Sequence, residues 1–373
     1  MKVVLFYHSA LSDWNHGNAH FLRGIAAELQ ARGHDVVIRE PASSWSAANL
    51  VADHGMRALL ATMRAYPTLV VERYDERQDL DAALDGAGLV IVHEWNTHEL
   101  VARIGRHRAS GGRYRLLFHD THHRSVSDAA AMAAYDLSGY DGVLAYGEVI
   151  RERYLRQGWA RRVWTWHEAA DVRVFRPRHG VPSRDLVWIG NWGDDERTKE
   201  IAAFLIEPVR TLGLPATVYG VRYPPAAIEA LGEAGVVYRG WLPNYRVPNA
   251  FARHRVTVHI PRRPYVEALP GIPTIRPFEA LACGIPLISA PWEDVERLFR
   301  AGRDYLVART GAEMTARLRD VLNDRELAAS LARHGRATIL ARHTCAHRVD
   351  ELFAILAELR TPAAVPAEGE IAV

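Results

Sequence analysis

The chain has 373 residues, of which 49% are hydrophobic and 24% charged, the composition of a folded protein long enough for two packed cores. Its 46 basic and 44 acidic residues leave a formal net charge of +2, which argues against a surface that holds nucleic acid by charge alone. Only Lys2 and Lys199 are lysines, so nearly all the positive charge is arginine. A coding bias accounts for most of these arginines, although a guanidinium is also the better fork for phosphate.

Cysteine content and hydropathy bear on the compartment. Cys283 and Cys345 are too few for a disulfide framework or a cysteine zinc cluster, so a reducing environment is the simpler assumption. No stretch approaches the roughly 20 apolar residues of a membrane span. The first apolar run, residues 3–6, leads directly into polar residues. We therefore expect a cytoplasmic protein, and peripheral contact with a membrane stays open.

Short apolar runs alternate with longer amphipathic stretches, which is the pattern of βαβ units on parallel sheets. The first series of predicted strands is 3–7, 35–38, 69–71, 89–93, 115–118, 142–145 and 163–166. A second series starts afresh with 186–189, 217–220, 236–238, 256–260, 286–289 and 305–307. This pattern predicts an α/β protein with two doubly wound, Rossmann-like domains facing a crevice, where open parallel sheets bind their ligands.

The two series are separated by residues 171–185, a turn-rich segment with two prolines that we interpret as a linker. We therefore predict an N-terminal domain over residues 1–172 and a C-terminal domain over residues 173–340. Residues 341–360 continue a helical pattern, and residues 361–373 are expected to be a flexible tail.

The segment 273–291, PTIRPFEALACGIPLISAP, predicts a loop, a helix and a buried strand. Pro277 suits the first helical position and disfavours helical backbone at Arg276, so we expect the helix to start at Pro277 and to end at Gly284. Free N–H groups at this helix start, beside Arg276, would suit an anion of diphosphate size. Glu279 offers two oxygens to a vicinal diol such as ribose, or it is a surface carboxylate that balances the helix dipole.

Residues around this helix resemble a known family. RPFEALACGIPLISAPWEDVERLFRAGRDYLV and the later RHGRATILARHTCAHRVDELFAIL resemble the C-terminal donor domain of GT-B glycosyltransferases, in particular the spore-maturation CgeB-like group. The matching positions are Arg276, Phe278, Glu279, Ala282, Cys283, Gly284, Gly302, His343, Thr344, His347 and Arg348. The resemblance implies a hexosyl-type transferase whose N-terminal domain binds the acceptor and whose last helix, 341–360, crosses back onto that domain.

The resemblance also implies a set of donor-binding residues. LVWIGNWGDDER resembles the first donor-domain strand and its loop, whose arginine reaches the donor diphosphate, although the adjacent acids would equally explain a solvated salt bridge. VVYRGWLPNYRVPNAF resembles the strand and turn that cup the base, although a tryptophan there is more often core. The implied set is Gly190, Asn191, Arg197, Gly240, Trp241, Leu242, Gly271, Ile272, Thr274, Arg276 and Glu279.

One position departs from the pattern of many retaining GT-B enzymes. Gly271 stands where those enzymes carry a second glutamate that touches the donor sugar. The loop around Gly271 is expected to offer backbone N–H groups and Thr274 instead. The stereochemical outcome of the transfer therefore stays open.

Polar residues follow several predicted strands of the N-terminal half. His119, Asp120 and His122 end one strand and are our predicted catalytic residues, with a histidine as general base or leaving-group contact. The alternatives are structural hydrogen bonding and a metal site that also includes His123. The metal site is the weaker alternative, because the adjacent side chains of His122 and His123 would point apart on a strand. The predicted acceptor-side residues are His16, Gly17, Asn18, His20 and Glu94, of which Gly17 and Asn18 have the alternative of turning the chain and capping a helix.

We therefore expect an enzyme that moves a sugar from a UDP-, GDP- or TDP-linked donor to an unknown hydroxyl acceptor on a glycan, lipid, protein or small molecule. We expect no cofactor, and the near-neutral net charge argues against a nucleic-acid partner. We also expect no metal, since arginines and helix N–H groups would balance the charge of the donor diphosphate. A nucleotide-sugar epimerase or hydrolase on the same fold, and a non-catalytic sugar-binding partner, are the alternatives.

Overall fold

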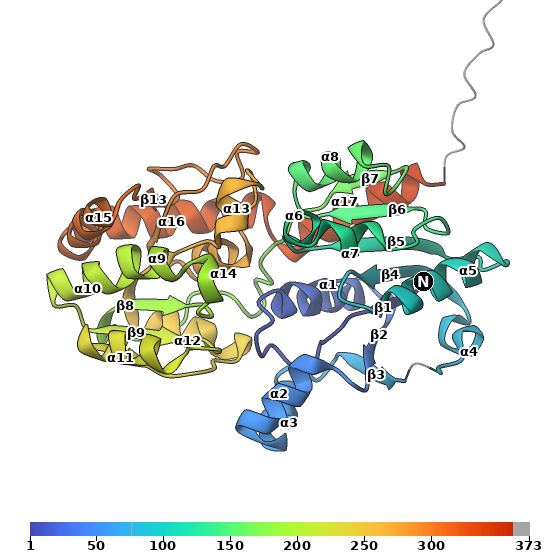
Figure 1. Ribbon diagram of the computed structural model, residues 1–373, viewed down its shortest axis with the longest axis horizontal. Helices are drawn as coiled ribbons and strands as arrows, with labels where there is room; N and C mark the ends of the chain where they lie inside the picture. Colours follow the sequence, from blue (N-terminus) through green and yellow to red (C-terminus); the bar gives the residue numbers. More distant parts are fainter. Residues whose placement is uncertain (76, 361–373) are drawn as a thin grey trace, which may run out of the picture.

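A computed structural model describes residues 1–75 and 77–360, which form two lobes side by side, each built on a parallel sheet (Figure 1). The strands of the first sheet are β1 (Lys2–Phe6), β2 (Asp35–Pro41), β3 (Val70–Tyr74), β4 (Ala87–His93), β5 (Arg115–Asp120), β6 (Gly142–Ala145) and β7 (Val163–Thr165). Those of the second are β8 (Arg184–Ile189), β9 (Ala216–Tyr219), β10 (Val236–Tyr238), β11 (His254–His259), β12 (Leu287–Ser289) and β13 (Leu306–Val307).

Both sheets are doubly wound. The strand order is β3-β2-β1-β4-β5-β6-β7 in the first sheet and β10-β9-β8-β11-β12-β13 in the second, and the pairings are parallel. Strands such as β1 and β4 are buried on both faces, which explains why they appear in the sequence as continuous apolar runs. Each predicted strand is present within a few residues of its expected ends, and the predicted α/β fold with two Rossmann-like domains is confirmed.

Helices cover both faces of the sheets. In the first lobe they are α1 (Ala19–Ala31), α2 (Trp45–His54), α3 (Met56–Ala65), α4 (Leu80–Leu84), α5 (His98–Ala109), α6 (Arg124–Ser127), α7 (Ala129–Ala133) and α8 (Glu148–Arg156). In the second they are η1 (Asp194–Glu196), α9 (Thr198–Ile201), η2 (Ala202–Ile206), α10 (Glu207–Leu212), α11 (Pro225–Glu233), η3 (Asn244–Arg246), α12 (Val247–Ala252), α13 (Arg263–Glu267), α14 (Ile275–Cys283), α15 (Gly311–Asn323) and α16 (Arg325–Arg342).

The last described helix, α17 (Cys345–Glu358), lies on the first lobe although it follows the second in sequence (Figure 1). It packs against α1, and the Trp166 indole N–H donates to the Arg348 carbonyl at 2.8 Å. Arg32 adds an ion pair with Asp350. The predicted crossing of the C-terminal helices back to the N-terminal domain is therefore confirmed.

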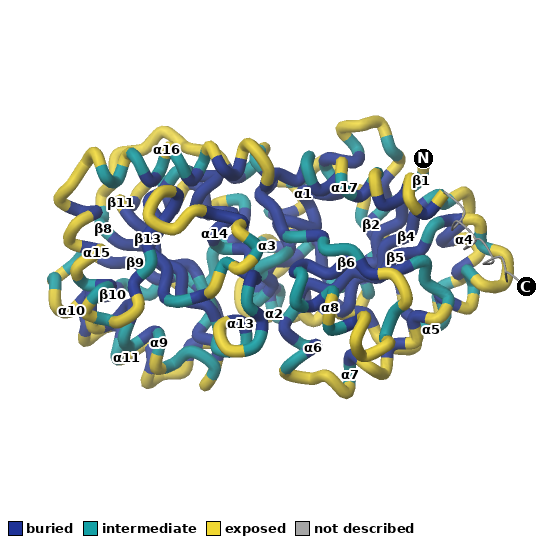
Figure 2. Tube along the Cα trace, turned by 90° about the horizontal axis from the view of Figure 1, so that it is seen from above, coloured by how far each residue is buried: buried dark blue, intermediate teal, exposed yellow. Residues whose placement is uncertain are grey.

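The apolar interior continues from one lobe to the other. One cluster of buried side chains joins Phe21 of α1, Phe278 of α14 and Val349 of α17, and Figure 2 shows buried chain running through the middle of the molecule. The chain leaves the first sheet at Thr165 and enters the second at Arg184, and the domain boundary predicted between these residues stays a prediction. The predicted tail, 361–373, lies outside the described residues.

None of the helices within residues 1–75 and 77–360 has the length and apolar character needed to cross a bilayer.

Candidate active site

A cleft of about 1070 Å³ lies where the carboxyl ends of the two sheets meet. The strand order reverses between β1 and β4 and between β8 and β11, and the loops after these strands contribute to the cleft walls, as is usual for open α/β sheets. The N-terminal wall includes His8, Asn15, His16, Gly17, Asn18, Trp45, Tyr74, Trp95, Asn96, Thr97 and His122. The C-terminal wall includes Gly190, Asn191, Arg197, Arg222, His259, Arg262, Tyr265, Thr274, Ile275 and Arg276.

Two predicted arginines, Arg197 and Arg276, meet in the C-terminal wall. Arg197 donates to the backbone carbonyls of Asn191, Trp192 and Ile260, and its guanidinium lies 5.3 Å from the centre of a buried indole, that of Trp188.

Burial lowers the pKa of Arg197 to about 10 and that of Arg276 to about 9, and the charge of Arg197 contributes to the second shift. The pKa of each guanidinium falls because its charged form lacks solvation, so a bound anion would be stabilised between them.

The helix start beside Arg276 differs by two residues from the prediction. Helix α14 begins at Ile275, so Pro277 is its third residue, where the missing N–H costs nothing because first-turn N–H groups have no partner within the helix. Thr274 precedes the helix with a φ of 60°, an uncommon conformation for a residue with a side chain. Thr274, Ile275 and Arg276 all line the cleft, and the predicted end at Gly284, with a φ of 70°, is confirmed.

Glu279 does not reach the cleft, contrary to the predicted ribose contact. It is fully buried, with Oε1 2.7 Å from Nδ1 of His20 and Oε2 paired with Arg276. Burial holds the pKa of His20 well below its ordinary value, so a neutral imidazole ring lies beside the carboxylate. The physical reason for the correction is that His20, from α1 of the other domain, lies against Glu279. Glu279 therefore supports Arg276 from behind.

The predicted base-binding turn also lies outside the cleft wall. Gly240, Trp241 and Leu242 do not line the cleft, since the loop after β1 and helix α2 cover Trp241. The Trp241 indole N–H donates to Asp13 at 2.9 Å, and its ring packs against His54 with centroids 5.0 Å apart. Gly190 and Asn191 do line the cleft, as predicted for donor contacts.

The loop around Gly271 has a different role from the one predicted. The N–H of Gly271 donates to the Glu293 carbonyl at 2.6 Å, and that of Ile272 donates to the Leu269 carbonyl at 3.4 Å. Neither N–H is therefore available to bind a nucleotide sugar. Gly271 has a φ of 94° and packs against the side chain of Glu296, where a Cβ would clash. Of the predicted loop residues, Thr274 is the one that lines the cleft.

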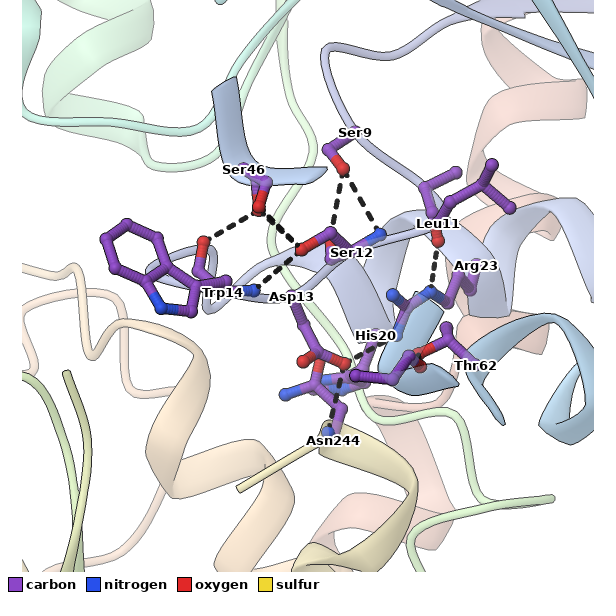
Figure 3. Close-up of polar contacts among 12 residues, drawn as sticks. Ser9, Leu11, Ser12, Asp13, Trp14, His20, Arg23, Ser46, Thr62 and Asn244 are labelled. Atoms are coloured by element: carbon purple, nitrogen blue, oxygen red, sulfur yellow. Dashed lines mark hydrogen bonds and ion pairs between the residues drawn. The ribbon is translucent and has the colours of Figure 1, made fainter. Parts of the chain in front are cut away.

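Asp13 joins the two domains beside the cleft (Figure 3). Its carboxylate pairs with the buried Arg23 at 3.0 Å and accepts the backbone N–H of Asn244 at 3.0 Å. Burial opposes the charge of Arg23, but Asp13 and Tyr66 together outweigh that effect, so the pKa of Arg23 is raised. The buried charge pair thus anchors the N-terminal loop to the second domain.

A second link between the domains is made by Glu296. Its Oε2 lies 2.6 Å from Nε2 of His167, and its Oε1 accepts the N–H of Glu148 at the start of α8 at 2.9 Å. Asn191 and Asn15 add a side-chain hydrogen bond across the cleft. The described arrangement is therefore one in which the two domains are in direct contact.

Of the predicted catalytic residues, His122 lines the cleft, whereas His119 and Asp120 lie behind the wall. The reason is that β5 extends to Asp120, so both side chains belong to the buried strand. The Asp120 carboxylate accepts the Tyr154 hydroxyl at 2.9 Å and the His122 N–H at 3.1 Å. Within the described part of the chain, no group of three His, Cys, Asp or Glu side chains is arranged to hold a metal.

The predicted acceptor-side residues separate in the same way. His16, Gly17 and Asn18 line the cleft, and the Asn18 amide donates to the Thr121 carbonyl at 3.2 Å rather than capping α1. His20 and Glu94 are buried outside the wall, because His20 faces Glu279 and Glu94 accepts the Thr121 N–H at 2.8 Å.

Sequence reasoning missed His8, His259 and Arg262, which also line the cleft. His8 follows β1, His259 is the last residue of β11, and Arg262 directly precedes α13. A polar residue directly after a predicted strand was the available signal, and the sequence rule that selected Glu94 after its strand would have selected His8 as well.

Comparisons with known proteins agree with this geometry. Residues 197–354 match the model of a family described as Glycosyl transferase-like. No curated protein matches the chain.

Solved structures with the same fold cover nearly the whole chain. HepE from Anabaena, in complex with UDP and glucose, has a TM-score of 0.64 at 14% identity over 96% of this chain and 100% of that one. Sucrose-phosphate synthase from Thermosynechococcus elongatus has a TM-score of 0.65 at 14% identity over 96% and 99%. An α-glucosyltransferase in complex with UDP and a 13-mer DNA has a TM-score of 0.69 at 12% identity over 96% and 99%.

These likenesses establish the fold, and the family match falls on the domain that carries Arg197 and Arg276. The chain therefore has the two-domain GT-B fold of these glycosyltransferases, and its residues 197–354 match the family described as Glycosyl transferase-like.

Proposed function

We propose that the chain transfers a sugar from a UDP-linked donor to a hydroxyl acceptor, and that it belongs to the CgeB-like group. The observation that supports this most is the pair of partly buried, cleft-lining arginines, Arg197 just before α9 and Arg276 in the first turn of α14. HepE was solved with UDP-glucose, which makes UDP the first nucleotide to test. The CgeB-like assignment rests on the motif from Arg276 to Gly284 and on the closing residues His343 to Arg348.

The two arginines would act on the leaving group. Transfer breaks the bond between the sugar carbon and the diphosphate, and negative charge develops on the diphosphate oxygens. Hydrogen-bond donors that are held in place in a water-poor site stabilise such charge without reorganising during the reaction. Glu279, paired with Arg276 on its buried side, would keep that guanidinium aimed at the cleft.

UDP binding is the direct test of the proposal. A ligand that binds only the folded state stabilises it by about 3 kcal/mol at 100 times its Kd, so UDP is expected to raise Tm by several degrees. The measurement is a thermal-shift series with UDP, GDP, TDP and ADP and their glucose conjugates. A rise with none of these nucleotides would contradict the proposal, and a rise with GDP or TDP alone would replace the base.

Transfer is expected to be independent of divalent metal, because guanidinium and helix N–H groups supply the positive charge. Turnover of UDP-glucose is expected to be unchanged after dialysis against EDTA and to gain nothing from added Mg²⁺ or Mn²⁺. Loss of activity with EDTA that Mg²⁺ restores would show that a metal meets the donor charge instead.

A further inference from the structure

A chain of polar side chains leads from the cleft into the first domain. It begins at His8, which follows β1 and lines the cleft. Nδ1 of His8 lies 3.4 Å from Nδ1 of His93, and Nε2 of His93 lies 2.9 Å from the Thr121 hydroxyl. The Thr121 hydroxyl lies 3.4 Å from Oε1 of Glu94. His93, Thr121 and Glu94 are all buried, so water does not compete for these contacts.

Glu94, the last member of this hydrogen-bonded series, sets the direction of the hydrogen bonds. Oε1 of Glu94 accepts the Thr121 N–H at 2.8 Å and the Thr121 hydroxyl at 3.4 Å. Because the hydroxyl donates to Glu94, it accepts from His93, and the proton of His93 is on Nε2. Nδ1 of His93 then accepts from Nδ1–H of His8. This tautomer leaves Nε2 of His8 with a free lone pair.

The hydrogen-bonded series ends at a pair of buried carboxyl groups, those of Glu94 and Asp120. Burial, reinforced by the nearby charge of Asp120, raises the pKa of Glu94 well above its ordinary value, and burial raises the pKa of Asp120 to about 6. Of the two carboxyl groups, Glu94 is therefore the more readily protonated, and Asp120 is the one that stays ionised to lower pH. Tyr154 and the N–H of His122 hold Asp120 in position.

We propose that His8 is the catalytic base that takes the proton of the acceptor hydroxyl, and that His93 and Thr121 pass a proton on to the Glu94 and Asp120 pair. The inference rests on the proposed function. The acceptor oxygen bonds to the sugar carbon as the bond from that carbon to UDP breaks, and UDP leaves with the electron pair. The acceptor proton moves to Nε2 of His8, each member passes one proton forward, and the carboxyl pair gains one.

The groups around His8 disfavour a proton that stays there. His16 from the loop after β1, His93 at the end of β4 and His122 after β5 surround its ring, and Arg124 of α6 lies over the neighbouring Trp95. Burial lowers the pKa of His8 to about 3, so its lone pair is available at neutral pH and a captured proton is passed on. Below a pH of about 6 the carboxyl pair is full, so the reaction should slow in acid.

The first test replaces the base. His8→Ala is expected to lower kcat for UDP-glucose, with water as the acceptor, by about 100-fold while leaving the Kd of UDP within 2-fold, since a general base contributes to chemistry alone. Added imidazole is expected to restore part of kcat. His107→Ala is the matched control, because that histidine pairs with Asp81 away from the cleft. Wild-type kcat in His8→Ala would overturn the proposal.

The second test cuts the relay without touching the cleft. Thr121→Val keeps the shape of a side chain that does not line the cleft but removes its hydroxyl, whereas Thr121→Ser keeps the hydroxyl. Thr121→Val is expected to lower kcat at least 10-fold and to abolish the fall in rate near pH 6, and Thr121→Ser is expected to restore both. Equal kcat and pH profiles for the two variants would overturn the relay. Absence of UDP binding in the wild type would instead contradict the proposed function.

Discussion

Arg276→Gln is expected to weaken UDP binding by about 10- to 100-fold, because hydrogen bonds to charged groups contribute about 1.5–3 kcal/mol. Arg276 lines the cleft from the first turn of α14, where helix N–H groups add to its positive charge. The measurement is titration calorimetry with UDP. Arg210→Gln is the control, because Arg210 is exposed and pairs with Glu207 on α10.

The buried neighbour of Arg276 gives a second readout of the same site. Glu279→Gln leaves the side-chain shape and removes the charge that pairs with Arg276, so we expect a smaller loss of UDP affinity than for Arg276→Gln. If Glu279→Gln abolished binding while Arg276→Gln retained it, the carboxylate would contact the nucleotide directly. An unchanged Kd in Arg276→Gln would contradict the assignment of the diphosphate to this wall.

Asp13→Ala is expected to lower the free energy of unfolding by about 3–5 kcal/mol, because it leaves the buried guanidinium of Arg23 without its counter-charge. The same change removes the acceptor of the Trp241 indole and of the Asn244 N–H, so contact between the domains is weakened too. The measurement is urea unfolding followed by circular dichroism.

A control and a compensating variant make the Asp13 prediction specific. Asp53 also accepts a tryptophan indole, that of Trp14 at 2.8 Å, but carries no buried partner charge, so Asp53→Ala is expected to cost about 1 kcal/mol. Adding Arg23→Met to Asp13→Ala should recover part of the loss, because no uncompensated charge is then buried. Equal losses for Asp13→Ala and Asp53→Ala would contradict the role of the charge pair.

Most of the fold could be predicted from the sequence because parallel strands buried on both faces appear as unbroken apolar runs. The runs that became β4 and β11 show this, since their burial follows from their own residues. The start of α14 was misplaced by two residues because proline is tolerated throughout the first turn. Local chemistry therefore determined the elements and only approximately their ends.

The site was less predictable because its membership depends on which side chains another domain covers. Arg197 and Arg276 were found from motif and helix geometry, and both line the cleft. Glu279 and Trp241 follow equally good local patterns, yet His20 and Asp13 of the other domain engage them. Nothing in the residues near Glu279 identifies His20, which lies about 260 positions earlier in the chain.

The position of α17 on the first lobe has a consequence for the order of events during synthesis. Domains generally fold as units, with N-terminal ones first as the chain emerges. Here the apolar side of α1 is covered by α17, whose residues end at Glu358, so the first lobe cannot complete its interior until the second has been made. The nascent chain must therefore keep the apolar side of α1 exposed while the whole second domain is translated. The two lobes then reach their final packing together.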